Sequence, residues 1–354
     1  MNELQLHTVL KRFAISTANY RFQEVNNGYI NDTYLVLVNT FPKYILQRIN
    51  SSVFSDTEGL MQNIQQAFRF LDAADYAKIE LKKTKTGAGY YRSESNESWR
   101  LMTFIAESTT YNTTKDPKIA FEAGRILGRF HQLMAKAPSH LYTPTIPDFH
   151  SISLRKVQFE TAVLAQNQPE KIRRTAALQD LIATLMPHMV ALSEQAQPLR
   201  VCHNDTKLNN ILFAKNDHKG LCFIDLDTLM PGYFYYDFGD TVRTLVNTAP
   251  EDEQDLSKIT FNEDLFQVCI DGLGANGPLL SRAEINALPM GAVYMPFMHG
   301  LRAYTDYLNG NVYYKVAYAD QNLDRSKSLF HFSQLALEKV PYMKSVLAST
   351  LRGS

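Results

Sequence analysis

Two short polar segments near the middle of the chain carry side chains that could perform phosphate chemistry. The first segment, HNDTKLNN, places Asp205 and Asn210 five positions apart, with Lys207 between them. The second segment, FIDLD, places Asp225 fifteen positions after Asn210, and a polar turn separates the two. A loop that is followed by a hairpin can return to its starting point. We therefore expect these carboxylate and amide groups to converge.

Oxygen ligands and a cation in this order meet the requirements of phosphoryl transfer from ATP. Asp205 would orient and deprotonate the attacking hydroxyl, and Lys207 would stabilise the charge of the transferred phosphate. Asn210 and Asp225 would hold Mg²⁺, which prefers hard oxygen ligands. The spacing H-x-D-x-x-x-x-N is that of a kinase catalytic loop. A polar loop between two helices would contain similar residues, but the second motif at a compatible distance favours a kinase.

The first hundred residues predict a small sheet that could support such a site. Strands rich in β-branched and aromatic residues are predicted at 33–38 and 43–49, with a turn between them. Apolar residues at helical spacing predict a helix over 57–76. Two more strands are predicted at 77–85 and 98–106. This pattern indicates an antiparallel sheet with one helix.

Beyond about residue 107 the apolar residues follow a helical period. The segment 118–136 has a continuous apolar stripe. Further helices are predicted at 151–165, 169–194, 236–248, 261–273, 281–308 and 326–350. Pro289 and Pro296 should break or kink the helix over 281–308.

These elements predict an α+β fold with two lobes. The N-terminal lobe, residues 1–106, would be a small antiparallel sheet that binds nucleotide. The C-terminal lobe, residues 107–354, would be larger, mainly helical, and would carry the catalytic and substrate-binding residues. A cleft between two such lobes is a favoured place for a ligand.

The central motifs resemble those of a known superfamily. HNDTKLNNILF, FIDLDT and YYDFGDTVR are similar to the aminoglycoside phosphotransferase and choline kinase superfamily of small-molecule kinases. Its members have a protein-kinase-like fold. Within it, NNGYINDTYLV, YILQRIN, VFSDTEGLMQNI and FIDLDTLMPGYFYYDFGD resemble the N-acetylhexosamine 1-kinases. The resemblance implies that ATP and Mg²⁺ are used to phosphorylate the anomeric hydroxyl of N-acetylglucosamine or N-acetylgalactosamine.

The loop NNGYINDTY occupies the place of the phosphate-covering loop in that resemblance. It contains Gly28, Asn31 and Thr33 as candidate nucleotide-binding residues. Backbone N–H groups in a tight turn can cradle phosphate oxygens. With a single glycine the motif is weak, and an ordinary hairpin turn would look the same.

The strand YILQRI lacks the lysine that kinases use to hold the phosphates. Gln47 and Arg48 stand there instead, and only one of two neighbours on a strand can face the nucleotide. Alignment favours Gln47, while a register shifted by one would favour Arg48, with Glu58 as a partner. Main-chain groups near Phe104 and Ala106 would bind adenine.

The acceptor site is expected in the C-terminal lobe, facing Asp205. The segment 298–316 concentrates polar and aromatic residues, which together suit a sugar. Arg302 and Tyr313 are the candidates from this segment, with Tyr29 covering the sugar from the other lobe. A surface helix end rich in tyrosines would look similar.

Three further polar residues are predicted to have supporting roles. Asp227 lies two positions after Asp225, and along extended backbone both would face the same way. Asp227 is therefore a possible alternative metal ligand. Asp237 and His203 are predicted to be structural and to hold the catalytic loop through hydrogen bonds.

The bulk properties limit the partners that we expect. Lys plus Arg and Asp plus Glu are both 36, so the formal net charge is zero and nothing favours nucleic-acid binding. The three cysteines are too few for a disulfide framework. No signal peptide or membrane span is predicted, so we expect a cytoplasmic monomer. Two alternatives remain open: a kinase of the same fold for choline, homoserine or another small alcohol, and a nucleotide-binding pseudokinase.

Overall fold

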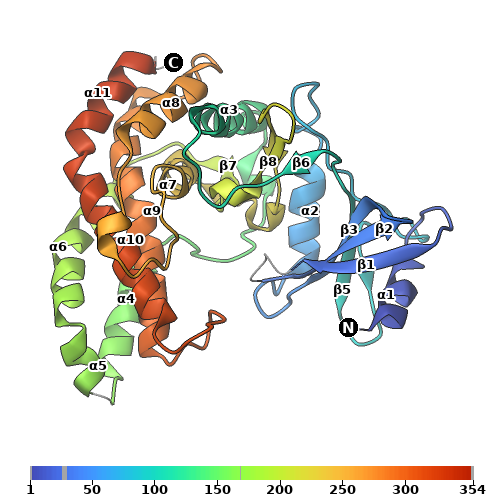
Figure 1. Cartoon of the computed structure of the whole chain (residues 1–354), viewed down its shortest axis with the longest axis horizontal. Helices are drawn as coiled ribbons and strands as arrows, with labels where there is room; N and C mark the ends of the chain where they lie inside the picture. The colour runs from blue at the N-terminus through green and yellow to red at the C-terminus, as the bar shows by residue number, and fades with distance from the viewer. Residues whose placement is uncertain (1, 26–29, 168, 352–354) are drawn as a thin grey trace.

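The computed structural model describes residues 2–25, 30–167 and 169–351. Figure 1 shows a small antiparallel sheet with one short helix at one end of the long axis and a larger helical part at the other. This arrangement confirms the predicted α+β fold. The N-terminus lies beside the sheet and the C-terminus lies at the far end of the helical part.

The sheet has five strands in the order β1-β2-β3-β5-β4, and every neighbouring pair is antiparallel. The strands are β1 (Tyr20–Val25), β2 (Asp32–Val38), β3 (Phe41–Ile49), β4 (Tyr91–Arg92) and β5 (Ser98–Thr103). One face packs against helix α1 (Glu3–Leu10) and forms a small core of its own. Because side chains alternate along a strand, the other face remains available to the site. The predicted strands at 33–38 and 43–49 are therefore confirmed.

Helix α2 (Thr57–Ala67) is shorter than the sequence predicts. After Ala67 the chain turns, which brings Leu71 and Tyr76 into the main core. There the Tyr76 hydroxyl accepts a hydrogen bond from the N–H of Phe223 at 2.9 Å. Burial of these two side chains against a distant strand outweighs continuation of the helix.

The segment 77–85 does not form the predicted strand. It makes only an isolated bridge to β5, between Leu81 and Met102, and a second bridge between Thr84 and Phe13. Its backbone groups divide their hydrogen bonds between β5 and the residues after α1. Because the partners are divided, no continuous ladder forms.

The helical part is built around one long buried helix, α9. Its helices are α3 (Pro117–Met134), α4 (Ile152–Leu164), α5 (Pro169–Arg174), α6 (Ala176–Ser193), α7 (Phe234–Leu245), α8 (Glu263–Gly274), α9 (Arg282–Leu308), α10 (Gln321–Glu338) and α11 (Val340–Thr350). Helix α9 packs against α4, α7 and α10. Pro289 and Pro296 do not break it, contrary to our expectation. Packing on nearly all sides compensates for the missing N–H groups.

Two predicted helices are each divided in the structure. The helix over 169–194 is divided at Thr175, whose hydroxyl bonds the Lys171 carbonyl and the Tyr304 hydroxyl. The helix over 326–350 begins earlier, at Gln321, and is interrupted where Pro341 opens α11. Proline suits the first turn of a new helix because its missing N–H needs no partner there.

Among the described residues, α6 alone is long and apolar enough to cross a membrane by length and composition. Its mean hydropathy is 1.2. One third of this helix is buried, and α6 places Ile182, Leu185 and Met189 in the main core. The expectation that no segment spans a membrane stays a prediction.

Two small sheets between the five-stranded sheet and the helices carry the central motifs (Figure 1). One contains β6 (Ser108–Thr109), β8 (Ile211–Ala214) and β9 (Gly220–Phe223), and the other pairs β7 (Arg200–Cys202) with β10 (Met230–Gly232). Helix α2 belongs to the main core rather than to the small core under α1. The lobe boundary between residues 106 and 107 stays a prediction.

Candidate active site

The loop that follows β7 is held by an aspartate at the start of α7. Asp237 accepts hydrogen bonds from the backbone N–H groups of His203 at 2.9 Å and Asn204 at 2.6 Å. Its own carbonyl accepts from the Thr206 hydroxyl at 2.5 Å. Asn204 has a left-handed backbone, with φ of 62°, which turns the chain sharply before Asp205. The predicted structural role of Asp237 is confirmed.

His131, Cys202 and Asp237 form a buried group whose ligand atoms lie within 4.8 Å of one another. Metal binding would need these atoms to be free. His131 Nε2 instead bonds Asp237 Oδ2 at 2.8 Å, and the same oxygen accepts the His203 N–H. Burial raises the pKa of the Cys202 thiol well above its ordinary value, so the thiol stays protonated. We interpret this group as a hydrogen-bond network that holds the loop.

Asp205 projects from this loop with one carboxylate oxygen engaged and one open. Oδ2 accepts hydrogen bonds from Lys207 Nζ and Asn210 Nδ2, both at 2.9 Å. Oδ1 accepts no hydrogen bond from any described residue, and the side chain is 22% exposed. Asp205 is therefore oriented by two neighbours and keeps an oxygen for a hydroxyl.

Asn210 and Asp225 lie on adjacent segments, as the sequence predicts. The Ile224 N–H donates to the Asn210 carbonyl at 2.8 Å, and His203 Nε2 donates to the Ile224 carbonyl at 2.9 Å. This contact gives His203 a structural role. Asp225 has a left-handed backbone with φ of 59° and an exposed side chain. Such a conformation is costly and persists only where the surroundings impose it.

The oxygen atoms of Asn210 and Asp225 fit a hard divalent cation, and these two residues together with Asp205 are called the corner below. Within the described residues, Asn210 donates through Nδ2 to Asp205, and its Oδ1 accepts no hydrogen bond. Desolvation, followed by the like charges of Asp227 and Asp205, raises the pKa of Asp225 to about 6. Because the Asp225 side chain nevertheless reaches solvent, repulsion between the carboxylates is the part of this shift that a bound cation would relieve.

Lys207 completes the charge balance of the corner. Burial lowers its pKa, but the carboxylates of Asp205 and Asp225 outweigh this and raise the pKa above its ordinary value. Lys207 therefore remains protonated throughout the physiological range. It is 26% exposed, so its ammonium group can also reach a ligand beside Asp205.

Asp227 does not share the environment of Asp225, contrary to the sequence expectation. Residues 226–228 form a 3₁₀ turn, so the backbone between the two carboxylates is not extended. Asp227 is 2% exposed and forms an ion pair with Arg100. Its other oxygen accepts from Asn31 Nδ2 at 2.6 Å. With both oxygens engaged, Asp227 is not an open metal ligand.

Arg100 is the site residue that sequence reasoning missed. It lies on β5, directly opposite Gln47 of β3, and is 1% exposed. Its Nε and Nη2 groups donate to Gln47 Oε1 at 2.9 and 2.7 Å, and Gln47 Nε2 donates to Thr33 Oγ1 at 3.0 Å. The signal was an arginine inside an apolar strand, which requires a buried anionic partner. On this face of the sheet, β5 supplies the positive charge through Arg100, and β3 supplies the side-chain amide of Gln47.

Arg48 lies on the opposite face of the sheet. It pairs with Asp32 and Glu97, and it does not reach Glu58, which instead accepts a hydrogen bond from Gln62. The structure does not bring Arg48 to Asp205, and the suggested pair with Glu58 is wrong. Neighbouring strand residues face opposite sides, so the Gln47–Arg100 pair leaves Arg48 on the outer side.

The remaining nucleotide-binding candidates are placed only in part. Gly28 lies outside the described residues, as does Tyr29, the residue predicted to cover the sugar. Phe104 donates its N–H to the Lys43 carbonyl at 3.1 Å. Among the described residues, the main-chain N–H and C=O of Ala106 have no backbone partner. Open main-chain groups at this position are compatible with binding a base edge.

Arg302 and Tyr313 are brought together at the end of α9. Arg302 Nη2 donates to the Tyr313 hydroxyl at 3.4 Å, and its guanidinium lies 4.8 Å from the centroid of the Phe149 ring. Asp306 accepts the N–H groups of Tyr313 and Tyr314 at 2.8 and 3.0 Å. Tyr313 is 52% exposed, so this cluster combines a fixed backbone with an open aromatic face.

Two buried histidines near Arg302 make stability depend on pH. Desolvation, then the charge of His299, lowers the pKa of His150 from 6.5 to about 3. The unfolded chain binds a proton below about pH 6.5 that the folded chain refuses, so the free energy of unfolding falls as pH falls. Between pH 7 and pH 4.5 we expect a His150→Gln variant to lose about 2 kcal/mol less stability than wild type. Urea unfolding at both pH values measures this, and equal losses would contradict it.

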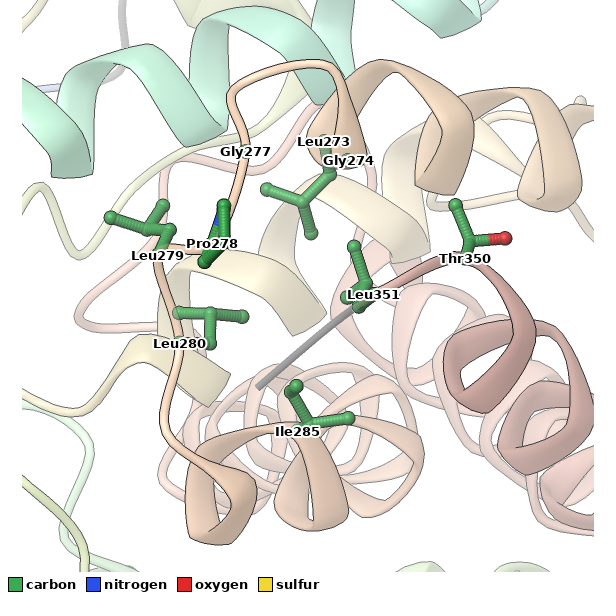
Figure 2. A pocket seen from close by; sticks show the side chains of 9 residues that line it. All are labelled: Leu273, Gly274, Gly277, Pro278, Leu279, Leu280, Ile285, Thr350 and Leu351. Carbon is green, nitrogen blue, oxygen red and sulfur yellow. The ribbon is translucent and has the colours of Figure 1, made fainter. Parts of the chain in front are cut away.

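The apolar cavity in Figure 2 lies away from these residues. It has a volume of about 290 Å³ between α8, α9 and α11, and most of its lining side chains are hydrophobic. Leu273, Leu280, Ile285 and Leu351 point into it. None of the candidate site residues lines it. Thr350 is the one polar side chain among its lining residues and none is charged, so it offers no chemistry for phosphate transfer.

A model of the phosphotransferase enzyme family, APH, matches residues 21–266, which is more than half of the chain. The chain therefore belongs to this phosphotransferase family. The match includes the segments of Asp205, Asn210 and Asp225. It confirms the predicted aminoglycoside phosphotransferase and choline kinase-like superfamily.

Three solved structures resemble the fold along its whole length. Spectinomycin phosphotransferase in complex with ADP and spectinomycin is 13% identical, with 95% of this chain and 98% of that chain covered and a TM-score of 0.61. A choline/ethanolamine kinase family protein from Mesorhizobium loti is 12% identical, with 98% and 99% covered and a TM-score of 0.61. Amicoumacin kinase in complex with AMP-PNP and Ca²⁺ is 12% identical, with 100% and 96% covered and a TM-score of 0.59. At such identities the likeness shows the fold.

Proposed function

We propose that this phosphotransferase uses ATP to phosphorylate the anomeric hydroxyl of an N-acetylhexosamine, which yields the sugar 1-phosphate. The observation that carries the kinase chemistry is the geometry of Asp205, whose Oδ2 is fixed by Lys207 and Asn210 while Oδ1 is open. The complexes of similar proteins with ADP and with AMP-PNP and Ca²⁺ support a nucleotide and a divalent metal.

In this mechanism Asp205 Oδ1 accepts a hydrogen bond from the acceptor hydroxyl. As the hydroxyl oxygen bonds to the γ-phosphorus, the bond from that phosphorus to the β,γ-bridging oxygen breaks and ADP leaves. Asp205 takes the hydroxyl proton late, because the transition state is loose and little base strength is needed. Lys207, whose charge the surrounding carboxylates maintain, stabilises the transferred group.

Asn210 Oδ1 and the Asp225 carboxylate would hold Mg²⁺, which neutralises the phosphate charges when bound. The same sheet face that carries Gln47, Thr33 and Arg100 would cover the nucleotide. Gln47 is fixed by Arg100 and cannot supply charge itself. We propose that main-chain groups near Ala106 bind adenine.

The proposal of a sugar acceptor is supported by the cluster at the end of α9. Arg302 offers guanidinium N–H groups, and the part of the Tyr313 ring that stays exposed beside it offers an aromatic surface. Hydroxyl groups need such donors, and the C–H faces of a sugar pack on aromatic rings. The named relatives act on other acceptors, so the cluster and the sequence resemblance carry this part of the proposal.

A panel of acceptors tests the proposal directly. The protein is incubated with ATP and Mg²⁺ together with N-acetylglucosamine, N-acetylgalactosamine, choline or homoserine, and ADP release is measured. We expect at least a 10-fold higher kcat/KM for one of the two sugars, and ³¹P NMR should show an anomeric phosphate. Preference for choline or homoserine would replace the sugar assignment. ATP binding without any phosphorylated product would indicate a pseudokinase.

A further inference from the structure

Three buried polar atoms lack a hydrogen-bond partner where α7, α9 and the residues before α4 meet. They are Asp240 Oδ2, His299 Nε2 and His150 Nδ1. The three residues are 1%, 8% and 4% exposed. Buried polar groups in folded proteins nearly always have partners, and an exception requires an explanation. Three exceptions in one place indicate that something outside the chain provides the missing hydrogen bonds.

These atoms belong to one cluster. His299 Nε2 lies 3.3 Å from Asp240 Oδ1, a close electrostatic contact that does not meet the geometry of a good hydrogen bond. The ring centroids of His150 and His299 are 6.4 Å apart in an edge-to-face arrangement. Helices α7 and α9, which carry Asp240 and His299, pack directly together (Figure 1). One bound molecule can therefore contact more than one of these atoms.

The cluster adjoins the catalytic loop. His150 Nε2 lies 3.0 Å from the carbonyl of Asn204, the residue immediately before Asp205. The charge of Lys207 acts on Asp240, and the charge of Asp240 acts on His150. A molecule bound against these side chains would thus lie near the loop that carries Asp205.

The hydrogen-bond chemistry of the cluster specifies what the molecule must offer. A carbonyl can only accept, so His150 Nε2 carries the proton that it donates to Asn204. His150 is neutral because burial lowers its pKa, and its Nδ1 is therefore an acceptor. The Asp240 carboxylate oxygen is also an acceptor. Two open acceptors require a ligand with at least two donors, such as hydroxyl or amide N–H groups.

The charges around the cluster disfavour a cationic ligand. Asp240 is paired with Arg243, and Asp306 is occupied by backbone N–H groups. Arg302 and Arg155 have no carboxylate partner among the described residues. These two guanidinium groups place unpaired positive charge on this side, and that charge repels an ammonium group.

The aromatic residues that could surround a cation are already occupied. The Arg302 guanidinium lies 4.8 Å from the Phe149 ring centroid, 5.7 Å from that of Tyr313 and 6.0 Å from that of Tyr314. A quaternary ammonium ligand uses such a box and has no N–H donor on its charged group. It would have to displace Arg302 and would leave both acceptors unsatisfied.

We propose that His150 Nδ1 and Asp240 Oδ2 form a hydroxyl-binding subsite for an uncharged polyhydroxylated acceptor and that this subsite rejects quaternary ammonium alcohols. His299 supports the subsite beside Asp240. The inference rests on the proposed function and assigns acceptor specificity to residues on α7 and before α4. Each acceptor atom takes one donor of the sugar, and the anomeric hydroxyl remains beside Asp205.

A substrate–variant cycle tests this subsite. ADP release is measured for wild type, His150→Phe and Asp240→Asn with the preferred N-acetylhexosamine and with its 3-, 4- and 6-deoxy analogues. His188→Asn, an exposed change on α6, is the control. For the parent sugar we expect a loss of at least about 10-fold in kcat/KM in each site variant, with KM for ATP changed less than twofold. With wild type, kcat/KM for one deoxy analogue should be lower than for the parent sugar by a similar factor. In the variant that lacks the matching acceptor atom, removal of the same hydroxyl should cause little further loss.

Additive losses for every deoxy analogue would overturn the subsite, even if the sugar is phosphorylated. Should His150→Phe fail to fold by thermal unfolding, Asp240→Asn and His299→Gln complete the same cycle. If no N-acetylhexosamine reacts but another neutral polyol does, the proposed function fails and the cycle is run on the deoxy forms of that polyol. Turnover of choline at least equal to that of the sugar would also overturn the subsite.

Discussion

The Asp205→Asn protein is expected to lose about 10³-fold or more in kcat while it still binds ATP. The reason is that the amide cannot take the proton of the acceptor hydroxyl, and loss of a positioned base costs about 10²–10⁴-fold. Asp205 is not among the proposed metal ligands, and Asn210 and Asp225 keep their backbone contact through Ile224. Nucleotide binding should therefore survive. Rapid-quench turnover and titration with a fluorescent ATP analogue measure the two quantities.

Asp217→Asn is the matched control for this change. Asp217 is an exposed aspartate in the turn between β8 and β9, and it bonds only the N–H of Lys219, at 3.1 Å, among the described residues. Its kcat should stay within twofold of wild type. An Asp205→Asn protein that keeps wild-type kcat would show that another group is the base. Loss of ATP affinity together with kcat would instead indicate that Asp205 organises the metal site.

The second large effect is expected at Arg100. Replacement by methionine leaves Asp227 buried with no cation, and breaking one side of a buried ion pair costs about 3–5 kcal/mol. Gln47 also loses its two hydrogen bonds from the guanidinium. Because Asp227 follows the strained turn at Asp225, we further expect weaker binding of Mg²⁺ with ATP. Urea unfolding and the Mg²⁺ dependence of kcat/KM measure these changes.

Arg48→Met provides the control on the other face of the same sheet. Arg48 also has two carboxylate partners, but its side chain is 36% exposed, so the expected cost is below about 1 kcal/mol. Arg100→Lys should recover part of the stability, since it restores the charge but not the forked geometry. Equal costs for Arg48→Met and Arg100→Met would refute the special role of the buried pair.

Local spacing along the chain was enough to predict that the candidate catalytic residues lie close together. The order Asp205, Lys207 and Asn210 lies within one short loop, and Asp225 follows across a single hairpin. Such contacts depend on few residues, so the sequence predicts them well. The same holds for the strands at 33–38 and 43–49, whose alternation and turn are local features.

Predictions failed where distant contacts outweighed a local pattern. Helix α2 ends at Ala67 because Tyr76 bonds Phe223, and α9 continues through two prolines because other helices enclose it. Asp225 and Asp227 diverge because a 3₁₀ turn replaces the expected extended backbone. Such distant contacts cannot be inferred from the residues of these short segments alone.

The sequence by itself determined the family, the fold class and the order of the chemical groups, because these depend on residue types and short spacings. Only the tertiary structure decided which charges are paired and which polar atoms are open. Arg100 meets Asp227 across 127 positions, and His150 meets Asn204 across 54. The energy of a charge or a polar atom depends on its burial and its partners. Both are properties of the packed chain rather than of any segment.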